Sequence, residues 1–206
     1  MSFNNSSFNF YTDSGLTSVF GGTLTIVNKT DLSDNPQDNV LYLGSTLSDR
    51  QLQAADNPGV SQIVLTPTDT LPHWIAATSY ISGKKVQPVS GNGFVYQCTT
   101  TGTSGSSEPT WPVSPLGATV SDGTCVWTLT AAHHPSTEIK LALSSGALAS
   151  TVGGAALNVA TTITGGSANA IPIFIRITNT VTTVSNDTGN EEMGIQINSC
   201  IETEIP

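Results

Sequence analysis

Three segments of this chain place an apolar residue at every second position. Isoleucines occupy positions 171, 173, 175 and 177, and the same spacing recurs at Ile139, Leu141 and Leu143 and again at Met193, Ile195 and Ile197. In an extended strand, successive side chains point to opposite faces of the sheet, so this spacing puts one row of apolar residues on a core. The chain is therefore expected to consist of strands that each bury one face.

Other segments extend this pattern toward the N-terminus. Further strands are expected at residues 24–28, 40–44 and 62–66, and glycine pairs with the Asn57-Pro58-Gly59 triplet supply turns between strands. Only residues 48–55 suggest a helix, of one or two turns, with Ser48 as its cap and Gln51 reaching back to it. Short strands separated by such turns predict an all-β fold, an antiparallel β-sandwich of Ig-like or jelly-roll-like type.

The aromatic residues indicate a second core. All three tryptophans, Trp74, Trp111 and Trp127, fall within residues 71–132, whereas the flanking sequence is rich in Ile, Val, Leu and Ala. A small module must bury a large apolar area per residue, and aromatic side chains supply it. We therefore expect residues 1–70 plus 133–206 to form the main sandwich, with residues 71–132 inserted as a small aromatic-rich β-module.

Within this window, Trp111 lies between Pro109 and Pro112, which stiffen the segment in an extended form. Strands are expected after the turn dipeptides Asn92-Gly93 and Asp122-Gly123. Trp111 then either covers the core of the module or forms an exposed platform for a sugar ring or a partner surface. In the second case Tyr96 and Trp127 are further candidate surface or glycan contacts.

The segment 79–130 resembles a small β-module found in tail, fibre and other virion proteins of tailed bacteriophages. The resemblance rests on Tyr80, Gly83, Val86, Asn92-Gly93, Tyr96, GTSG at 102–105, EPTWP at 108–112, Gly117, Val120, DGT at 122–124 and Trp127. It covers about a quarter of the chain and implies a carbohydrate-binding-like or surface-exposed accessory module. Cys98 and Cys125 depart from the small or β-branched residues common there; they are expected to be reduced and buried, with a disulfide between them as the alternative.

Charge and composition exclude several partners. The net charge is −9 and the chain has only six Lys and Arg, whereas nucleic-acid binding depends on clustered cations, so no nucleic acid is expected. Residues 1–15 have neither a basic start nor an apolar run, and no segment reaches the roughly 20 apolar residues that cross a bilayer. We therefore expect no secretory signal, no membrane insertion and, with only three cysteines, no disulfide framework.

No enzyme motif is recognisable in the sequence. HExxH, paired CxxC, GxSxG and phosphate-binding loops are absent, and the carboxylates Glu108 and Asp122 have ready structural roles in a stiff loop and a turn. His133 and His134 would point to opposite faces if extended, and a solvated loop explains them better than a metal. A calcium site of Asp31, Asp34 and Asp38 lacks the EF-hand spacing. We expect no catalysis, cofactor or metal.

Together these features predict a non-enzymatic structural component of a bacteriophage virion, assembled in the host cytoplasm. It would be a capsid decoration protein or a neck, tail or baseplate accessory protein, present as a homo-oligomer or in many copies, with the aromatic module projecting outward. It would bind other virion proteins by surface complementarity. The alternative is a receptor-binding or glycan-binding adhesin or tail fibre protein, which uses Trp111, Tyr96 and Trp127 to hold a host surface glycan.

Overall fold

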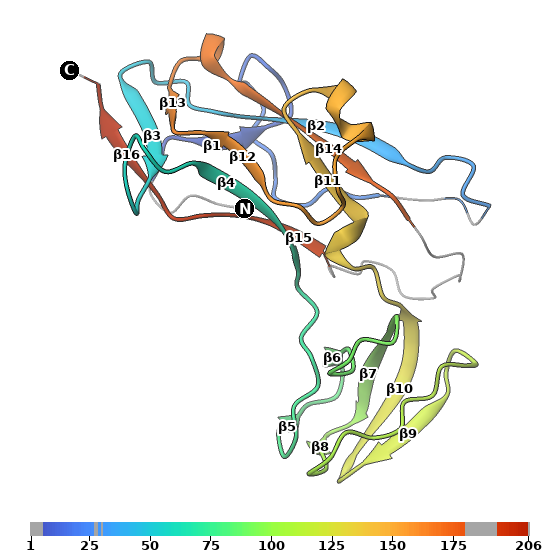
Figure 1. Ribbon diagram of the computed structural model, residues 1–206. Helices are drawn as coiled ribbons and strands as arrows, with labels where there is room; N and C mark the ends of the chain where they lie inside the picture. Colours follow the sequence, from blue (N-terminus) through green and yellow to red (C-terminus); the bar gives the residue numbers. More distant parts are fainter. Residues whose placement is uncertain (1–5, 27–28, 30, 180–192, 206) are drawn as a thin grey trace. The chain divides into compact units, whose positions relative to one another are not determined.

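The computed structural model describes residues 6–26, 29, 31–179 and 193–205, and in these the regular structure is strands and short 3-10 turns (Figure 1). The 3-10 turns are Ser136–Glu138, Ser145–Ala149 and Ser167–Asn169. The chain divides into two compact units. One, here the aliphatic unit, comprises Met1–Thr68, Ser136–Asn179 and Ile195–Pro206; the other, the aromatic unit, comprises Asp69–Pro135 and Thr180–Gly194.

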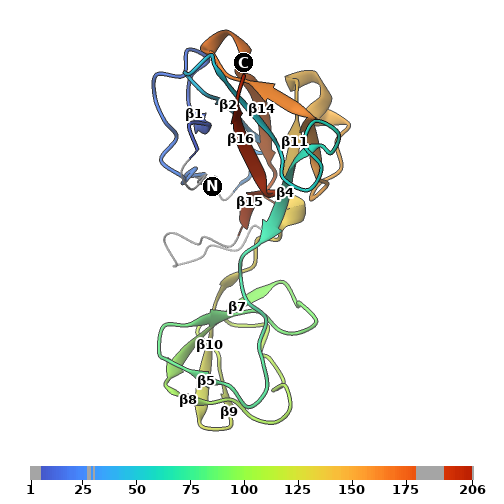
Figure 2. The ribbon, with the colours of Figure 1, turned by 90° about the vertical axis from the view of Figure 1, so that its left-hand side faces the viewer.

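The first layer of the aliphatic unit is a four-stranded sheet with the strand order β1-β2-β14-β11 (Figure 2). Its strands are β1 (Asn9–Tyr11), β2 (Gln37–Gly44), β14 (Ile171–Ile177) and β11 (Ile139–Ala142). All three neighbouring pairs are antiparallel. At one end of the central pair, the guanidinium of Arg176 binds both carboxylate oxygens of Asp38, its register partner, at 2.6 and 2.7 Å.

The other layer consists of two short three-stranded sheets, with the orders β12-β4-β15 and β13-β3-β16. Their strands are β12 (Leu157–Ala160), β4 (Ile63–Asp69), β15 (Met193–Ile197), β13 (Thr162–Thr164), β3 (Arg50–Ala54) and β16 (Cys200–Glu204). The layers pack together as a β-sandwich, which confirms the predicted fold class. The Ig-like or jelly-roll-like type stays a prediction.

The period-two spacing produces the core of this sandwich. In β14, Ile173, Ile175 and Ile177 are buried while the residues between them are half-buried. The facing layer contributes buried residues from β3 and β4, namely Leu52, Ala54, Ile63 and Leu65. The pattern is thus one of aliphatic rows from both layers, as expected for a sheet with one covered face.

Three expectations for local structure fail. Leu143, expected in the buried row with Ile139 and Leu141, lies beyond the end of β11 and is 40% exposed. The predicted helix at residues 48–55 is wrong, because residues 50–54 form β3. Leu52 and Ala54 are buried, while the amides of Gln51 and Gln53 donate to Thr203 and Thr162 on the two neighbouring strands. Of the predicted strand at residues 24–28, residues 24–26 form no strand, and residues 27 and 28 lie outside the described residues.

A carboxylate joins the two ends of the described chain. Glu202 in β16 accepts hydrogen bonds from the Ser6 hydroxyl and from both the backbone N–H and the hydroxyl of Ser7, at 2.6–2.8 Å. Burial alone would raise the pKa of Glu202, but these hydrogen bonds and the nearby Arg50 outweigh it and lower the pKa. The N-terminal segment is therefore fixed to the last strand by an ionised side chain.

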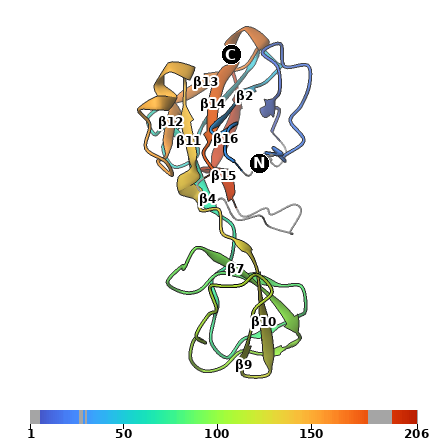
Figure 3. The same cartoon turned by 90° about the vertical axis from the view of Figure 1, so that its right-hand side faces the viewer.

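The aromatic unit contains a four-stranded antiparallel sheet and a two-stranded ribbon (Figure 3). The sheet has the order β6-β7-β10-β9, with β6 (Lys85–Val86), β7 (Phe94–Thr100), β10 (Cys125–Ala132) and β9 (Thr119–Asp122). The ribbon pairs β5 (Ser79–Tyr80) with β8 (Gly102–Thr103). The turn dipeptides at 92–93 and 122–123 precede β7 and β10, as the sequence predicts.

The core of this unit is aromatic. Its buried cluster is Trp74, Tyr80, Val86, Tyr96, Cys98, Cys125, Trp127 and Leu129, and Phe94, Trp111, Leu116 and Val120 pack against it. None of the isoleucines of β11, β14 and β15 belongs to this cluster. The aliphatic and aromatic residues that the sequence separates are thus also separate in space.

Removing the aromatic unit tests whether the sandwich folds alone. We predict that replacing residues 69–135 by a short glycine linker between Thr68 and Ser136 leaves a soluble β protein with one cooperative thermal transition by circular dichroism. The connecting segments meet at Asp69 and His133, whose carboxylate oxygen and ring nitrogen lie 3.1 Å apart, so a short linker spans the gap. An insoluble product, or one that melts without cooperativity, would mean that the sandwich needs the inserted unit.

Candidate functional site

A buried carboxylate accepts hydrogen bonds from parts of the aromatic unit that are distant in sequence. Asp122, at the end of β9, is only 4% exposed. Its Oδ2 atom accepts the indole N–H groups of Trp74 at 2.7 Å and Trp127 at 2.9 Å, and its Oδ1 atom accepts the backbone N–H of Gly105 at 2.7 Å. A buried charge is tolerated when hydrogen bonds replace its hydration. Asp122 is thus an internal anchor for two tryptophans.

Glycines allow the two motif loops around Asp122 to interlock. A Cβ atom on Gly123, whose φ is +60°, would lie 2.3 Å from the carbonyl oxygen of Thr103, and one on Gly102 would lie 2.4 Å from that of Thr124. The backbone N–H of Thr124 donates to the Thr103 carbonyl, and the Thr103 N–H donates to the Thr124 hydroxyl. The GTSG and DGT segments are therefore conformational requirements of this contact.

The same loop fixes the segment that precedes β5. The Ser104 hydroxyl donates to the carbonyl of Ile75 at 2.8 Å and accepts the backbone N–H of Thr78 at 3.0 Å. The backbone N–H of Ala77 donates to the carbonyl of Gly105. These bonds hold the backbone of residues 75–78 in a defined turn.

Trp111 covers the aromatic core from the proline-rich loop. Its ring centroid lies 4.4 Å from that of Tyr96 and 5.8 Å from that of Trp127. Its indole N–H donates to Oε1 of Glu108 at 2.8 Å, and the same oxygen accepts the backbone N–H of Val89. The indole is partly buried. Of the two roles considered for Trp111, the structure therefore supports the one in which it covers the core.

The structure corrects the other two candidate surface contacts. Tyr96 and Trp127 are both fully buried, at 0% exposure. The hydroxyl of Tyr96 is already used, since it donates to the carbonyl of Pro112 and accepts the amide of Asn92. Burial is the common fate of aromatic area in a small core, and neither ring offers a face to a ligand. Of the three predicted contacts, only Trp111 has exposed surface.

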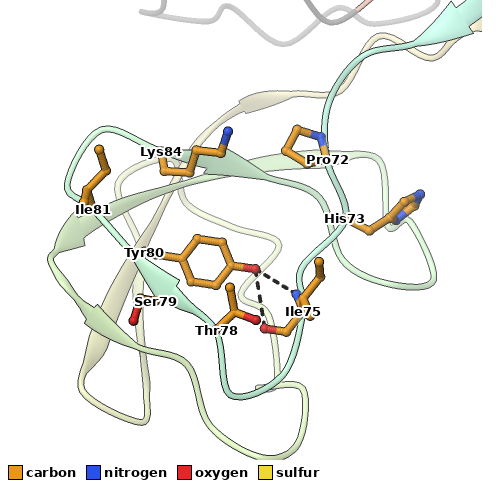
Figure 4. Close-up of a pocket in the computed structure, with 8 residues that line it drawn as sticks. All are labelled: Pro72, His73, Ile75, Thr78, Ser79, Tyr80, Ile81 and Lys84. Atoms are coloured by element: carbon orange, nitrogen blue, oxygen red, sulfur yellow. Dashed lines mark hydrogen bonds between the residues drawn. The ribbon is translucent and has the colours of Figure 1, made fainter.

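A depression on the surface of the aromatic unit is the candidate binding site (Figure 4). It has a volume of about 290 Å³ and lies between the turn at residues 72–75 and β5 with the loop that follows it. Its exposed walls include Ile75 and Ile81, at 60% and 70% exposure, and the ring of Tyr80 forms part of its buried side. Because Ile75 and Ile81 expose aliphatic surface beside the same depression, this depression is a candidate contact surface.

Polar groups lie at the rim of this depression. The hydroxyl of Tyr80 accepts the backbone N–H of Ile75, and burial raises the pKa of Tyr80, so the phenol stays neutral at physiological pH. Lys84 also lines the depression, and among the described residues no carboxylate forms an ion pair with its ammonium group. The site therefore combines an aliphatic surface with one cation that has no ionic partner among the described residues.

Sequence reasoning placed His133 in a solvated loop, but the structure buries it. His133 is 8% exposed, and its Nε2 atom lies 3.1 Å from Oδ2 of Asp69, within ion-pair distance although without hydrogen-bond geometry. The Gln87 amide donates to the same carboxylate oxygen at 3.3 Å. These residues join the two connecting segments of the aromatic unit. Nothing in the local sequence indicates this pairing.

Two cysteines lie in the core of the aromatic unit. Cys98 and Cys125 are free and buried, and burial raises the pKa of both thiols.

The three carboxylates considered for calcium each bind a different group. Asp31 accepts the backbone N–H of Ser33, Asp34 accepts that of Lys29, and Asp38 binds the guanidinium of Arg176. The described residues contain no metal-binding cluster of His, Cys, Asp and Glu, and no helix long and apolar enough to cross a membrane.

Asp122→Asn should destabilise the aromatic unit by about 2 kcal/mol. Both carboxylate oxygens of Asp122 accept hydrogen bonds from N–H groups. In asparagine an N–H₂ group replaces one of these oxygens and faces an N–H donor. Glu108→Gln is the matched control. One oxygen of Glu108 accepts both of its donors, so glutamine should change stability by less than about 0.5 kcal/mol.

Urea unfolding followed by tryptophan fluorescence measures this difference, because all three tryptophans lie in the aromatic unit. Equal stabilities for Asp122→Asn and the wild-type chain would contradict the anchoring role of Asp122.

Comparisons of this chain with protein-family models, with curated proteins and with solved structures give no match.

Proposed function

We propose that this chain is a non-enzymatic structural component of a bacteriophage virion, either a capsid decoration protein or a neck, tail or baseplate accessory protein. It assembles in the host cytoplasm by surface complementarity with other virion proteins and is present in many copies. The resemblance of residues 79–130 to the small β-module of phage tail and fibre proteins supports this proposal. The proposal also agrees with the absence of recognisable enzyme motifs from the sequence.

The observation that carries the proposal is the kind of apolar surface that the aromatic unit exposes. Its tryptophans and tyrosines face inward or are partly covered, and the exposed large apolar residues in its described part are the aliphatic Ile75, Ile81, Val89 and Val113. Sugar rings bind to exposed aromatic faces, whereas aliphatic patches beside polar groups are typical of protein contacts. The aromatic unit is therefore better suited to hold a protein than a glycan.

The charge of the chain agrees with a protein partner. Net charge −9, with only six Lys and Arg, disfavours any surface rich in phosphate. It also keeps separate copies soluble until a complementary surface is available. In a particle, the aromatic unit would project outward while the sandwich packs against neighbouring proteins.

One observation favours the alternative, a receptor-binding or glycan-binding adhesin. Trp111 retains exposed surface, and Pro109 and Pro112 flank it in the chain. A stiff, partly exposed indole offers a stacking face at low entropic cost. Both roles fit one protein if a particle-anchored unit also binds host glycans.

Particles purified by density gradient from infected host cells test the proposal. We expect mass spectrometry to find the chain in the particle band at a constant ratio to the capsid protein, with an abundant host cytosolic enzyme as the control that stays at the top of the gradient. A chain that also remains at the top would contradict a virion role. Saturable binding of the full chain on a glycan array, abolished by Trp111→Ala in a folded variant, would favour the adhesin.

A further inference from the structure

The depression at residues 72–84 has both an apolar and an electrostatic requirement. Ile75 and Ile81 expose aliphatic surface that a partner would cover, and Lys84 supplies a positive charge on the same rim (Figure 4). The complementary group is an aliphatic side chain with a carboxylate close to it in sequence.

The charge of this chain identifies a source for such a group. Lys84 is one of only six Lys and Arg, against fifteen Asp and Glu. A cation without an ionic partner among the described residues, in so acidic a chain, matches the surface of another copy of the same chain. Electrostatic complementarity of this kind selects partners and sets orientation.

In the described part of the aliphatic unit, three loops carry an exposed aliphatic residue close in sequence to an aspartate. They contain Asp13 with Val19, Leu47 with Asp49, and Asp56 with Val60. The first carboxylate is occupied by the backbone N–H groups of residues 17 and 18, and the second lies 3.7 Å from the guanidinium of Arg50.

The third loop fits the requirement. Asp56 binds only the hydroxyl of Ser61, at 2.9 Å, and has no cation beside it among the described residues. Val60, at 68% exposure, is the most exposed aliphatic residue of the three loops. The turn at residues 57–60 is held by hydrogen bonds from the backbone N–H groups of Val60 and Ser61 to the carbonyl of Asn57. The loop is therefore a preformed knob between β3 and β4.

We propose that the depression at residues 72–84 binds the Asp56–Val60 loop of a second copy of this chain, with Val60 against Ile75 and Ile81 and with Asp56 paired to Lys84. The contact joins two different surfaces, so a pair of copies keeps one free depression and one free loop, and the assembly can grow beyond a dimer. This inference rests on the proposed function, since it supplies the many-copy assembly that a virion component needs.

Sedimentation velocity of the full chain over a range of concentrations tests the contact. We expect association that increases with protein concentration. Lys84→Glu and Asp56→Lys should each raise the dissociation constant about tenfold or more, because each places like charges together. The double variant Lys84→Glu with Asp56→Lys should restore most of the wild-type association, because the pair is then reversed.

Two further variants test the apolar part of the contact, one inside the site and one outside it as a control. Ile81→Ser should also weaken association, since it removes aliphatic area from the depression. Val152→Ser, which alters an aliphatic residue of 72% exposure outside the proposed contact, should leave association unchanged. All these residues are exposed, so circular dichroism spectra should match that of the wild-type chain.

A chain that stays monomeric at every concentration would overturn the proposal, and so would association that none of the variants changes. Single reversals that weaken association without rescue in the double variant would also overturn the pairing of Lys84 with Asp56. These outcomes are separate from the fate of the proposed function. A monomeric chain found in purified particles would remove this contact alone, whereas an associating chain absent from particles would remove the virion role.

Discussion

The aromatic unit depends on one buried carboxylate. Asp122 accepts two indole N–H groups and one backbone N–H, which together replace the water that an ionised group needs. The same bonds satisfy Trp74 and Trp127, whose polar atoms would otherwise be buried without partners. This arrangement fixes the distance between β9, β10 and the segment that enters the unit. Gly105 lies so close to Asp122 that a Cβ atom would come within 2.9 Å of its Oδ1, and the contact between the neighbouring loops requires Gly102 and Gly123 in the same way.

Repeating features of the sequence predicted the fold well. The isoleucine spacing of β14 and the turn dipeptides before β7 and β10 are local signals, and the structure follows them. The helix expected at residues 48–55 fails because Leu52 and Ala54 alternate over too short a segment to decide the period, and pairing with β13 and β16 decides it instead. The role of Asp122 was also hidden, because Trp74 lies 48 residues away in sequence. A dipeptide that predicts a turn does not reveal a distant donor.

The sequence also failed to predict which residues form the surface of the candidate site. Tyr96 and Trp127 were singled out because aromatic residues are common ligand contacts, yet they form the interior. Ile75 and Ile81 belong to no periodic pattern and were not predicted as contacts, yet they are exposed to solvent. A small unit has few large side chains, and those used for the core are not available for binding. The motif residues thus build the scaffold, and the segments between them carry the surface on which the proposed assembly depends.

Hydrogen exchange of the three indole N–H groups, followed by NMR, tests the central claim that the tryptophan pattern is internal. The indole protons of Trp74 and Trp127 should exchange only when the aromatic unit unfolds, because both bind the buried Asp122. The indole proton of Trp111, bound to Glu108 in a partly buried loop, should exchange faster. Exchange of Trp74 or Trp127 at the rate of a free indole would contradict the account.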